Sequence, residues 1–202
     1  MTIPLRSQTA VRLLYFLLLS MMLVRVAAAD PPGRVARLAD ASGDISYSSA
    51  YDEPWSSAER NRPLVAGDRL WTGPRARAEL QVGSAAVRLA GDTSVEILDL
   101  DDSIAQLRLT QGTLNLRVAR VYAGQRIEIA TPTLALSVER AGRYRIDVDP
   151  DGEYTSVLVY SGAAEAFGDG ARFPLRAGDN LTFYSADLGD YEIAAIPAAD
   201  AF

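Results

Sequence analysis

Residues 64–116 read LVAGDRLWTGPRARAELQVGSAAVRLAGDTSVEILDLDDSIAQLRLTQGTLNL, and this stretch decides the fold. Apolar and polar residues alternate through it, most clearly over residues 76–82, where every second side chain is apolar. Because successive side chains of a strand leave opposite faces, a period of two predicts half-buried β-strands. Turn signals separate these strands: Ala66-Gly67-Asp68, Gly73-Pro74, Gly83-Ser84, Gly91-Asp92 and Gln111-Gly112.

The same patterning continues on both sides of this stretch, and no segment after residue 29 keeps a helical period for three turns. We therefore predict an all-β single domain, with less than about 10% helix against a usual third. Further strands are predicted at residues 34–38, 44–47, 126–131, 134–138, 143–148, 154–160, 163–167, 172–175, 181–184 and 191–196.

Composition narrows the function. The 202 residues include no Cys, no His and no Lys, so all 20 basic residues are Arg. Catalysis by a Ser–His or Cys–His pair is excluded, and so is a zinc site of the usual ligands. Residues 30–202 carry 17 Arg against 26 acidic residues, a formal charge of −9. This acidic balance argues against a nucleic-acid partner, which needs a positive surface.

The amino terminus, residues 1–29, is predicted to be a signal peptide. Arg6 and Arg12 precede an apolar run of 12 residues, LLYFLLLSMMLV, and Ala27-Ala28-Ala29 supplies the small residues of a cleavage site. The run is shorter than the roughly 20 residues of a membrane-spanning helix, although an uncleaved anchor remains the alternative. We therefore expect a periplasmic or secreted protein, with no membrane attachment after cleavage, that folds without disulfides.

The rest of the chain divides into a linker at 30–33, a β domain at 34–184 and a C-terminal tail at 185–202 with a possible last strand. A weak internal repeat lies within the domain, since PLVAGDRL at 63–70 matches PLRAGDNL at 174–181 at six of eight positions. We interpret it as one strand–turn–strand unit used twice. The chain ends in apolar residues without a closing strand, so a longer natural protein is an alternative.

Several short motifs at this spacing resemble the FecR domain family: AGDRLWTG at 66–73, ARAEL at 76–80, Gly83-Ser84, VRL at 87–89, LTQGTL at 109–114, Thr131-Pro132, and VLV at 157–159 leading to Ser161-Gly162. The resemblance covers about residues 34–184. It implies an extracytoplasmic all-β module, in which many short strands form a solenoid-like or roll-like stack. In the FecR regulators this module follows an inner-membrane helix and a cytoplasmic anti-sigma segment, and it receives a signal from a TonB-dependent receptor.

Only about a dozen residues precede the hydrophobic run here, so we expect a secreted form without the cytoplasmic anti-sigma segment. The expected function is an exported, non-enzymatic binding or scaffolding module of the bacterial cell envelope, with an envelope protein as partner. One alternative is a glycan- or peptidoglycan-binding module, which a row of exposed aromatic residues would favour; the sequence shows no such row. A second is a glycosidase, which needs two facing carboxylates.

Two acidic clusters are candidate cation sites. Asp147, Asp149, Asp151 and Gly152 match the start of a calcium loop, but the twelfth position is Leu158, where Glu is required. A solvated hairpin tip is therefore expected, with a weak calcium site as the alternative, and the same holds for the cluster at residues 99–102. No catalytic, cofactor-binding or metal-binding residue is predicted, and no cofactor.

Other residues have structural or binding interpretations. Leu80 and Leu89 are expected on the apolar face of adjacent strands. Trp55 is expected to anchor the polar loop 48–62 on the core, with an exposed binding Trp as the alternative. Three arginines are expected on outward strand positions, either in salt bridges with Glu79 and Glu96 or as a contact for an anionic partner: Arg75, Arg77 and Arg88.

The apolar tail IAAIP at 193–197 indicates an uncovered sheet edge, which is a docking place for an extended segment of a partner. The alternative is that the strand at 35–38 covers this tail. The oligomeric state stays open.

Overall fold

The computed structural model describes residues 35–50 and 54–197, which fall in one compact unit, Pro32–Phe202. Regular structure in these residues consists of strands without a helix, which confirms the predicted all-β class. The signal peptide and the linker expected at 1–33 lie outside the described residues. Among the residues described, no helix is long and apolar enough to cross a membrane.

The strands follow one another at short intervals, as the spacing of the turn signals predicts. In chain order they are β1 (Ala36–Ser42), β2 (Ile45–Ser48), β3 (Ser56–Ser57), β4 (Pro63–Leu64), β5 (Arg69–Thr72), β6 (Arg77–Val82), β7 (Ala85–Leu89), β8 (Thr93–Leu100), β9 (Ile104–Val118), β10 (Arg126–Ala130), β11 (Ala135–Val138), β12 (Gly142–Val148), β13 (Thr155–Ser161), β14 (Ala163–Phe167), β15 (Arg172–Arg176), β16 (Asn180–Phe183) and β17 (Tyr191–Ile193).

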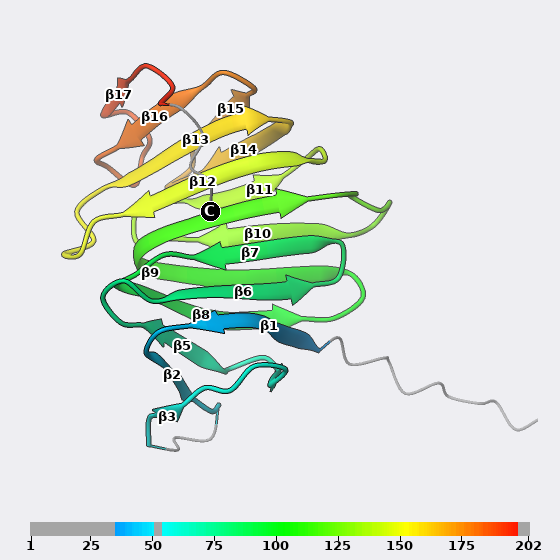
Figure 1. Cartoon of the computed structure of the whole chain (residues 1–202). Helices are drawn as coiled ribbons and strands as arrows, with labels where there is room; N and C mark the ends of the chain where they lie inside the picture. Colours follow the sequence, from blue (N-terminus) through cyan, green and yellow to red (C-terminus); the bar gives the residue numbers. More distant parts are fainter. Residues whose placement is uncertain (1–34, 51–53, 198–202) are drawn as a thin grey trace, which may run out of the picture. The chain divides into compact units, whose positions relative to one another are not determined.

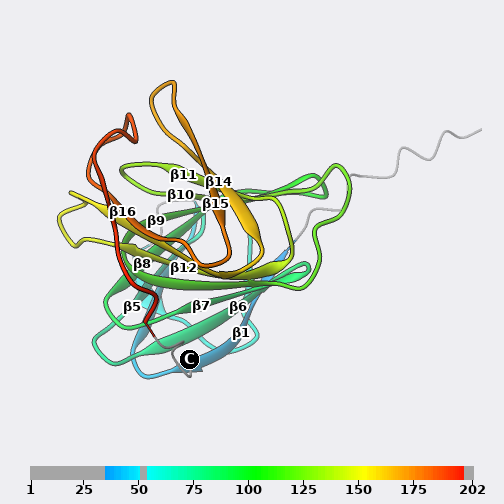
Figure 2. The same ribbon diagram turned by 90° about the horizontal axis from the view of Figure 1, so that it is seen from above.

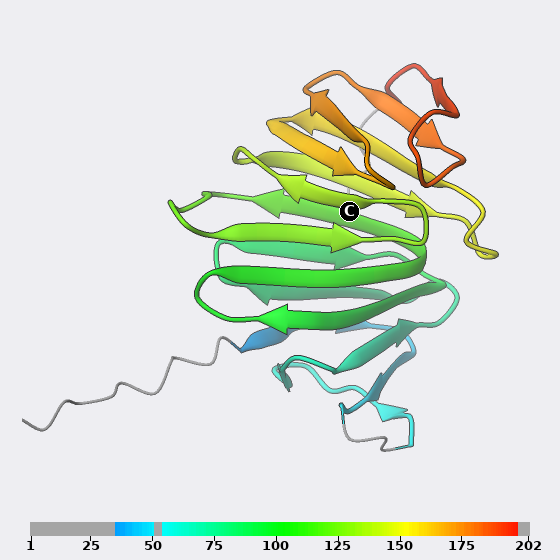
Figure 3. The same ribbon diagram turned by 180° about the vertical axis from the view of Figure 1, so that it is seen from behind.

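These strands form two stacked layers that share β9. Sheet A, in front in Figure 1, has the order β4, β1, β6, β7, β9, β12, β13, β16, β17. Sheet B, in front in Figure 3, has the order β3, β2, β5, β8, β9, β10, β11, β14, β15. Seen from above in Figure 2, β1, β6 and β7 lie on one side and β10, β11 and β14 on the other. The roll-like stack is therefore confirmed.

Strand β9 passes from one sheet to the other. Its first half pairs with β8 and β10 in sheet B, and its second half pairs with β7 and β12 in sheet A. The change falls at Gly112, whose φ is +90°, a conformation that residues with a Cβ rarely adopt. The turn predicted at Gln111-Gly112 is therefore wrong, because the glycine bends the strand without ending it.

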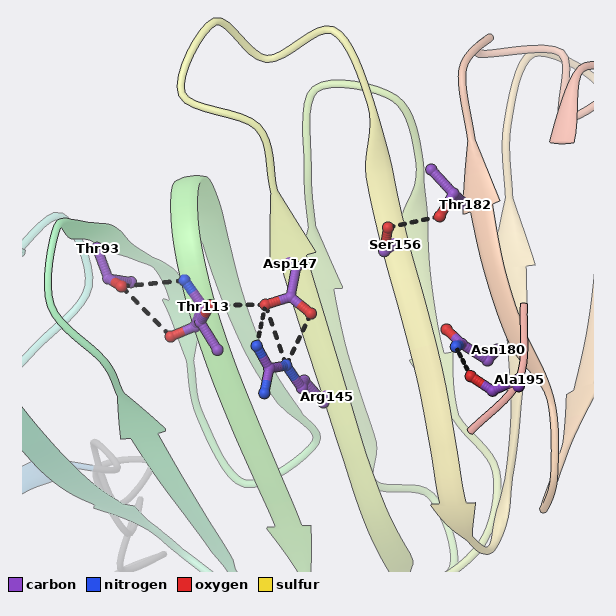
Figure 4. A network of polar contacts seen from close by, with 8 residues as sticks. All are labelled: Thr93, Thr113, Arg145, Asp147, Ser156, Asn180, Thr182 and Ala195. Atoms are coloured by element: carbon purple, nitrogen blue, oxygen red, sulfur yellow. Dashed lines mark hydrogen bonds and ion pairs between the residues drawn. The ribbon is translucent and has the colours of Figure 1, made fainter. Parts of the chain in front are cut away.

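A side-chain hydrogen bond stabilises the point where β9 changes sheets. The hydroxyl of the buried Thr93 accepts a hydrogen bond from the Thr113 amide at 3.0 Å, which Figure 4 shows beside the bend. A buried amide without a partner costs free energy, so Thr93 supplies what the interrupted ladder lacks at this point.

The core lies between the inner faces of the two sheets. Across sheet A the register aligns Leu38, Leu80, Val87, Leu116 and Tyr144, and each of these side chains is almost completely buried. The prediction that Leu80 and Leu89 lie on the apolar face of adjacent strands is thus confirmed for β6 and β7.

Tyr144 is the one residue of this row with a polar end. Its hydroxyl accepts from the Ala163 amide at 3.1 Å and lies 2.5 Å from the Arg140 carbonyl, to which it can donate. Burial raises the pKa of Tyr144, so the phenol keeps the proton that this bond needs.

The two copies of the sequence repeat form the same turn. In the first, the Asp68 carboxylate accepts from the Val65 amide at 2.9 Å, and in the second the Asp179 carboxylate accepts from the Arg176 amide at 2.7 Å. The glycine before each Asp has a positive φ and donates its amide to a neighbouring strand. The repeat therefore forms the same turn twice, directly before β5 and directly before β16.

The two aspartates differ in burial, which predicts unequal contributions to stability. Asp68 is 2% exposed and also accepts from the Tyr47 hydroxyl at 3.0 Å and the Ala50 amide at 3.3 Å. Asp68→Ala is expected to lower the free energy of unfolding by about 1–3 kcal/mol, because buried donors lose their acceptor. Asp179→Ala, the matched control, is expected to cost about 1 kcal/mol or less. Urea denaturation of both variants measures this, and equal losses would contradict the assignment.

Candidate partner-binding edge

The two sheets end in four strands that pair on one side only within the described residues. At one end of the stack these are β3 and β4, of two residues each, and β4 begins with Pro63. Short strands and prolines are how sheet edges avoid unwanted pairing. At the other end, the last strand is β15 in sheet B and β17 in sheet A.

Strand β15 is blocked as an edge by its own sequence. The Gly168 amide donates to the Ala171 carbonyl, so Gly168 and Ala171 form a hydrogen-bonded pair at the start of the hairpin. Every second residue along β15 then directs its backbone N–H and C=O to β14, and these residues are Phe173 and Leu175. The residue between them, Pro174, then faces outward and has no N–H to offer. Arg172 and Arg176 flank it on exposed positions, so this edge is charged as well as short of donors.

Strand β17 is not blocked in this way. The Ala194 amide donates to the Asn180 carbonyl and the Tyr184 amide donates to the Asp190 carbonyl, so residues 190, 192 and 194 face β16. In an antiparallel pair the backbone groups of alternate residues point the opposite way. The amides and carbonyls of Tyr191 and Ile193 therefore point to the open side, where no described strand pairs with them.

The side chains at this edge are apolar and partly uncovered. Tyr191 and Ile193 stand opposite Phe183 and Leu181, on the inner face of sheet A. Tyr191 packs against Phe173 at 5.1 Å between ring centroids, and Phe173 packs against Phe183 at 5.6 Å, which closes the end of the core. Tyr191 nevertheless stays 40% exposed and Ile193 75% exposed, so the apolar surface of the core continues out to the edge.

The edge is held in place from both sides. Figure 4 shows the Asn180 side chain donating to the Ala195 carbonyl at 2.7 Å, which fixes the chain just beyond β17. The loop before β17 is fixed by the Asp169 amide, which donates to the Ala186 carbonyl at 2.6 Å, and by the buried Leu188. A fixed edge loses little conformational entropy when a partner binds.

The structure contradicts one of the two interpretations of the tail. The strand at 35–38 does not cover it, because β1 pairs with β4 and β6 at the far end of sheet A (Figure 1). That alternative is wrong. The predicted last strand exists, although it ends at Ile193 and not at residue 196. Ile196, which follows it, is 43% exposed.

The predicted charged residues lie on other strands and turns, and two of them pair with each other. Arg88 and Glu79 form the expected ion pair at 2.6 Å on sheet A, whereas Glu96 pairs with Arg108 at 3.0 Å on sheet B. Arg77 lies at the exposed start of β6, as expected. Arg75 lies in a turn with φ 64°, so its predicted strand position is wrong.

Acidic residues of both clusters accept hydrogen bonds or form an ion pair within the fold. Asp147 accepts from Thr113 at 2.6 Å and pairs with Arg145 at 2.8 Å (Figure 4). Asp149 and Asp101 accept backbone amides of their own turns. Across residues 35–50 and 54–197, no group of three or more acidic, His or Cys side chains is placed to hold a metal ion.

A glycosidase pair also lacks support in the described residues. Asp68 is the one acidic residue among their buried polar side chains, and its oxygens accept from Tyr47, Ala50 and Val65. A buried carboxylate with this many donors stabilises a turn, and no second one faces it.

Residues 68–165, from the turn before β5 to β14, match the family model of the FecR protein. Two crystal structures of a candidate anti-sigma factor from Parabacteroides distasonis share the fold, each with a TM-score of 0.54, at 13% and 12% sequence identity. The match covers 63% of this chain and 59% of each of those chains. No curated protein matches the chain.

These comparisons concern the fold, and the family match does not include β17. At such low identity the solved structures show a shared fold alone. The family match ends at Glu165, so β15, β16 and β17 follow it. The candidate edge is therefore defined by the geometry of this chain.

Proposed function

We propose that this domain is an exported, non-enzymatic binding module of the cell envelope, and that it receives an extended segment of a partner protein at the open side of β17. The observation that carries the proposal is the contrast between two edges at the same end of the stack. Pro174 and two arginines block β15, whereas β17 offers backbone groups that pair with no described strand, beside apolar side chains.

The chemical groups at the edge indicate which kind of partner segment would fit it. Tyr191 and Ile193 present two amides and two carbonyls, each able to contribute about 0.5–1.5 kcal/mol net in a new strand pair. Their side chains add apolar surface, while Glu192 points to the other face, where it accepts from the Tyr184 hydroxyl at 3.2 Å. An extended segment with apolar residues at alternate positions fits this arrangement. The match to the FecR model supports a role in receiving a signal, since the FecR regulators use this domain for that purpose.

A charged substitution at the most exposed position tests the proposal. Ile193→Asp is expected to change the free energy of unfolding by less than about 0.5 kcal/mol, as for other surface positions, and to lose the envelope protein that the wild type captures by crosslinking. The matched control is Arg172→Asp on the blocked edge β15, which is expected to keep that partner. A loss of several kcal/mol in Ile193→Asp would show that the tail belongs to the core, and a stable variant that keeps its partner would contradict docking at β17.

A further inference from the structure

The two tryptophans of the chain lie together on the outer face of sheet B. Trp55 was expected to anchor its loop on the core, but that prediction is wrong, because its side chain is 50% exposed. Trp55 and the half-buried Trp71 line a shallow hollow of about 340 Å³, together with Ser46 and Ser94. The only tryptophans in the sequence therefore meet at one surface site, although 16 residues separate them.

The strand register explains why the indole rings are accessible. Ser46, Trp71 and Ser94 stand side by side on β2, β5 and β8, and all three point away from the core. The neighbour on each side of Trp71 is a small serine, and Trp71 stays partly exposed between them. Arg69 lies two residues before Trp71 on β5 and donates to the Ser48 hydroxyl at 3.0 Å. Its guanidinium lies 5.6 Å from the centroid of the Trp55 ring, which steadies the exposed indole.

The surroundings of the hollow decide which ligand it suits. Strands β2, β5 and β8 each pair on both sides, so a peptide finds no free backbone ladder at this place. None of the four lining residues is ionisable, so the lining suits an uncharged group. The site offers two flat aromatic faces and two hydroxyls that can both donate and accept hydrogen bonds. Aromatic walls with a few polar groups are typical of small-ligand sites.

We infer that the hollow between Trp55 and Trp71 binds a pyranose ring of a β-1,4-linked saccharide. A pyranose with equatorial substituents has apolar C–H faces and a rim of hydroxyls. The faces can stack on the indoles while the rim reaches Ser46 and Ser94. Chains with β-1,4 links are flat ribbons, which match the flat row of side chains across three strands. This site lies at the opposite end of the stack from β17 (Figure 1), so the module can hold a glycan and a protein at once.

Titration with two defined saccharides, chitotetraose and cellotetraose, tests the inference. Because the chain holds only these two tryptophans, its intrinsic fluorescence reports directly on the hollow. We expect a saturable change in tryptophan emission with at least one of the two saccharides, and binding of both would show that the acetamido group is not required. Affinity is then measured by calorimetry for Trp71→Ala and for Trp55→Ala, which truncates an exposed ring. Each variant is expected to bind at least tenfold more weakly, and Trp55→Ala, which removes an exposed ring, is expected to keep the melting temperature of the wild type.

Tyr122→Ala is the matched control, because Tyr122 is an equally exposed aromatic residue outside the hollow and is expected to leave binding unchanged. Several outcomes would overturn the inference. The first is that neither saccharide changes the emission at millimolar concentration. The second is that a proline-rich decapeptide binds in their place. The third is that Tyr122→Ala weakens binding as much as Trp71→Ala. None of these results bears on the edge at β17, so the two proposals can fail separately.

Discussion

Truncating Leu80 to alanine is expected to lower the free energy of unfolding by about 2–5 kcal/mol. Leu80 is fully buried at the centre of β6, between Leu38 of β1 and Val87 of β7 in the register of sheet A. The removed atoms lose their transfer free energy, and paired strands on both sides prevent the backbone from closing the cavity. Urea denaturation monitored by circular dichroism measures the change.

Glu79→Ala on the same strand is the control for Leu80→Ala. Glu79 points outward and pairs with Arg88 on the surface, where such ion pairs are worth about 0–1 kcal/mol. A loss below about 0.5 kcal/mol for Leu80→Ala would place Leu80 on the surface and contradict the register of β6.

Replacing Gly112 by alanine is the other substitution with a large expected effect, about 2–5 kcal/mol. Part of this cost, roughly 1–2 kcal/mol, comes from the positive φ. The rest comes from overpacking, because a Cβ would lie 2.6 Å from the Thr93 Cα and 2.7 Å from the Asp92 carbonyl oxygen. The displaced Thr93 would also lose its hydrogen bond with the Thr113 amide at the point where β9 changes sheets.

Gly124 separates the two contributions. Its φ of +79° is similar, but an added Cβ would meet no atom within 4 Å. Gly124→Ala is therefore expected to cost only the roughly 1–2 kcal/mol of the backbone conformation. Equal losses in the two variants, measured by chemical denaturation, would show that the contact with Thr93 does not constrain the crossing.

Local patterning predicted the strands well, because burial on one face imposes the period of two that the sequence shows. The same glycine signal, however, fits a turn between strands and a bend within one. Strand β9 bends at Gly112 because its first half pairs with β8 and β10, whereas its second half pairs with β7 and β12. Those pairings link residues far apart in the chain, and local alternation carries no information about them.

The candidate sites depend on such long-range pairings too. The apolar tail at 193–197 was a local sign of an edge. Which strand stays open, however, depends on where β1 pairs, and the sequence left that undecided. Trp55 and Trp71 meet only because β2 pairs with β5, so their separation in the sequence gave no sign of a shared hollow.

Docking at β17 is tested most directly by removing one outward amide without disturbing the ladder to β16. In Ile193→Pro the side chain is reduced and the N–H is lost, while Ile193→Ala reduces the side chain alone. Both variants are compared for capture of the protein that crosslinks to wild-type residue 191, at matched melting temperature. The account predicts that Ile193→Ala keeps most of the captured partner and that Ile193→Pro loses it. Equal capture by the two variants would contradict strand addition at this edge.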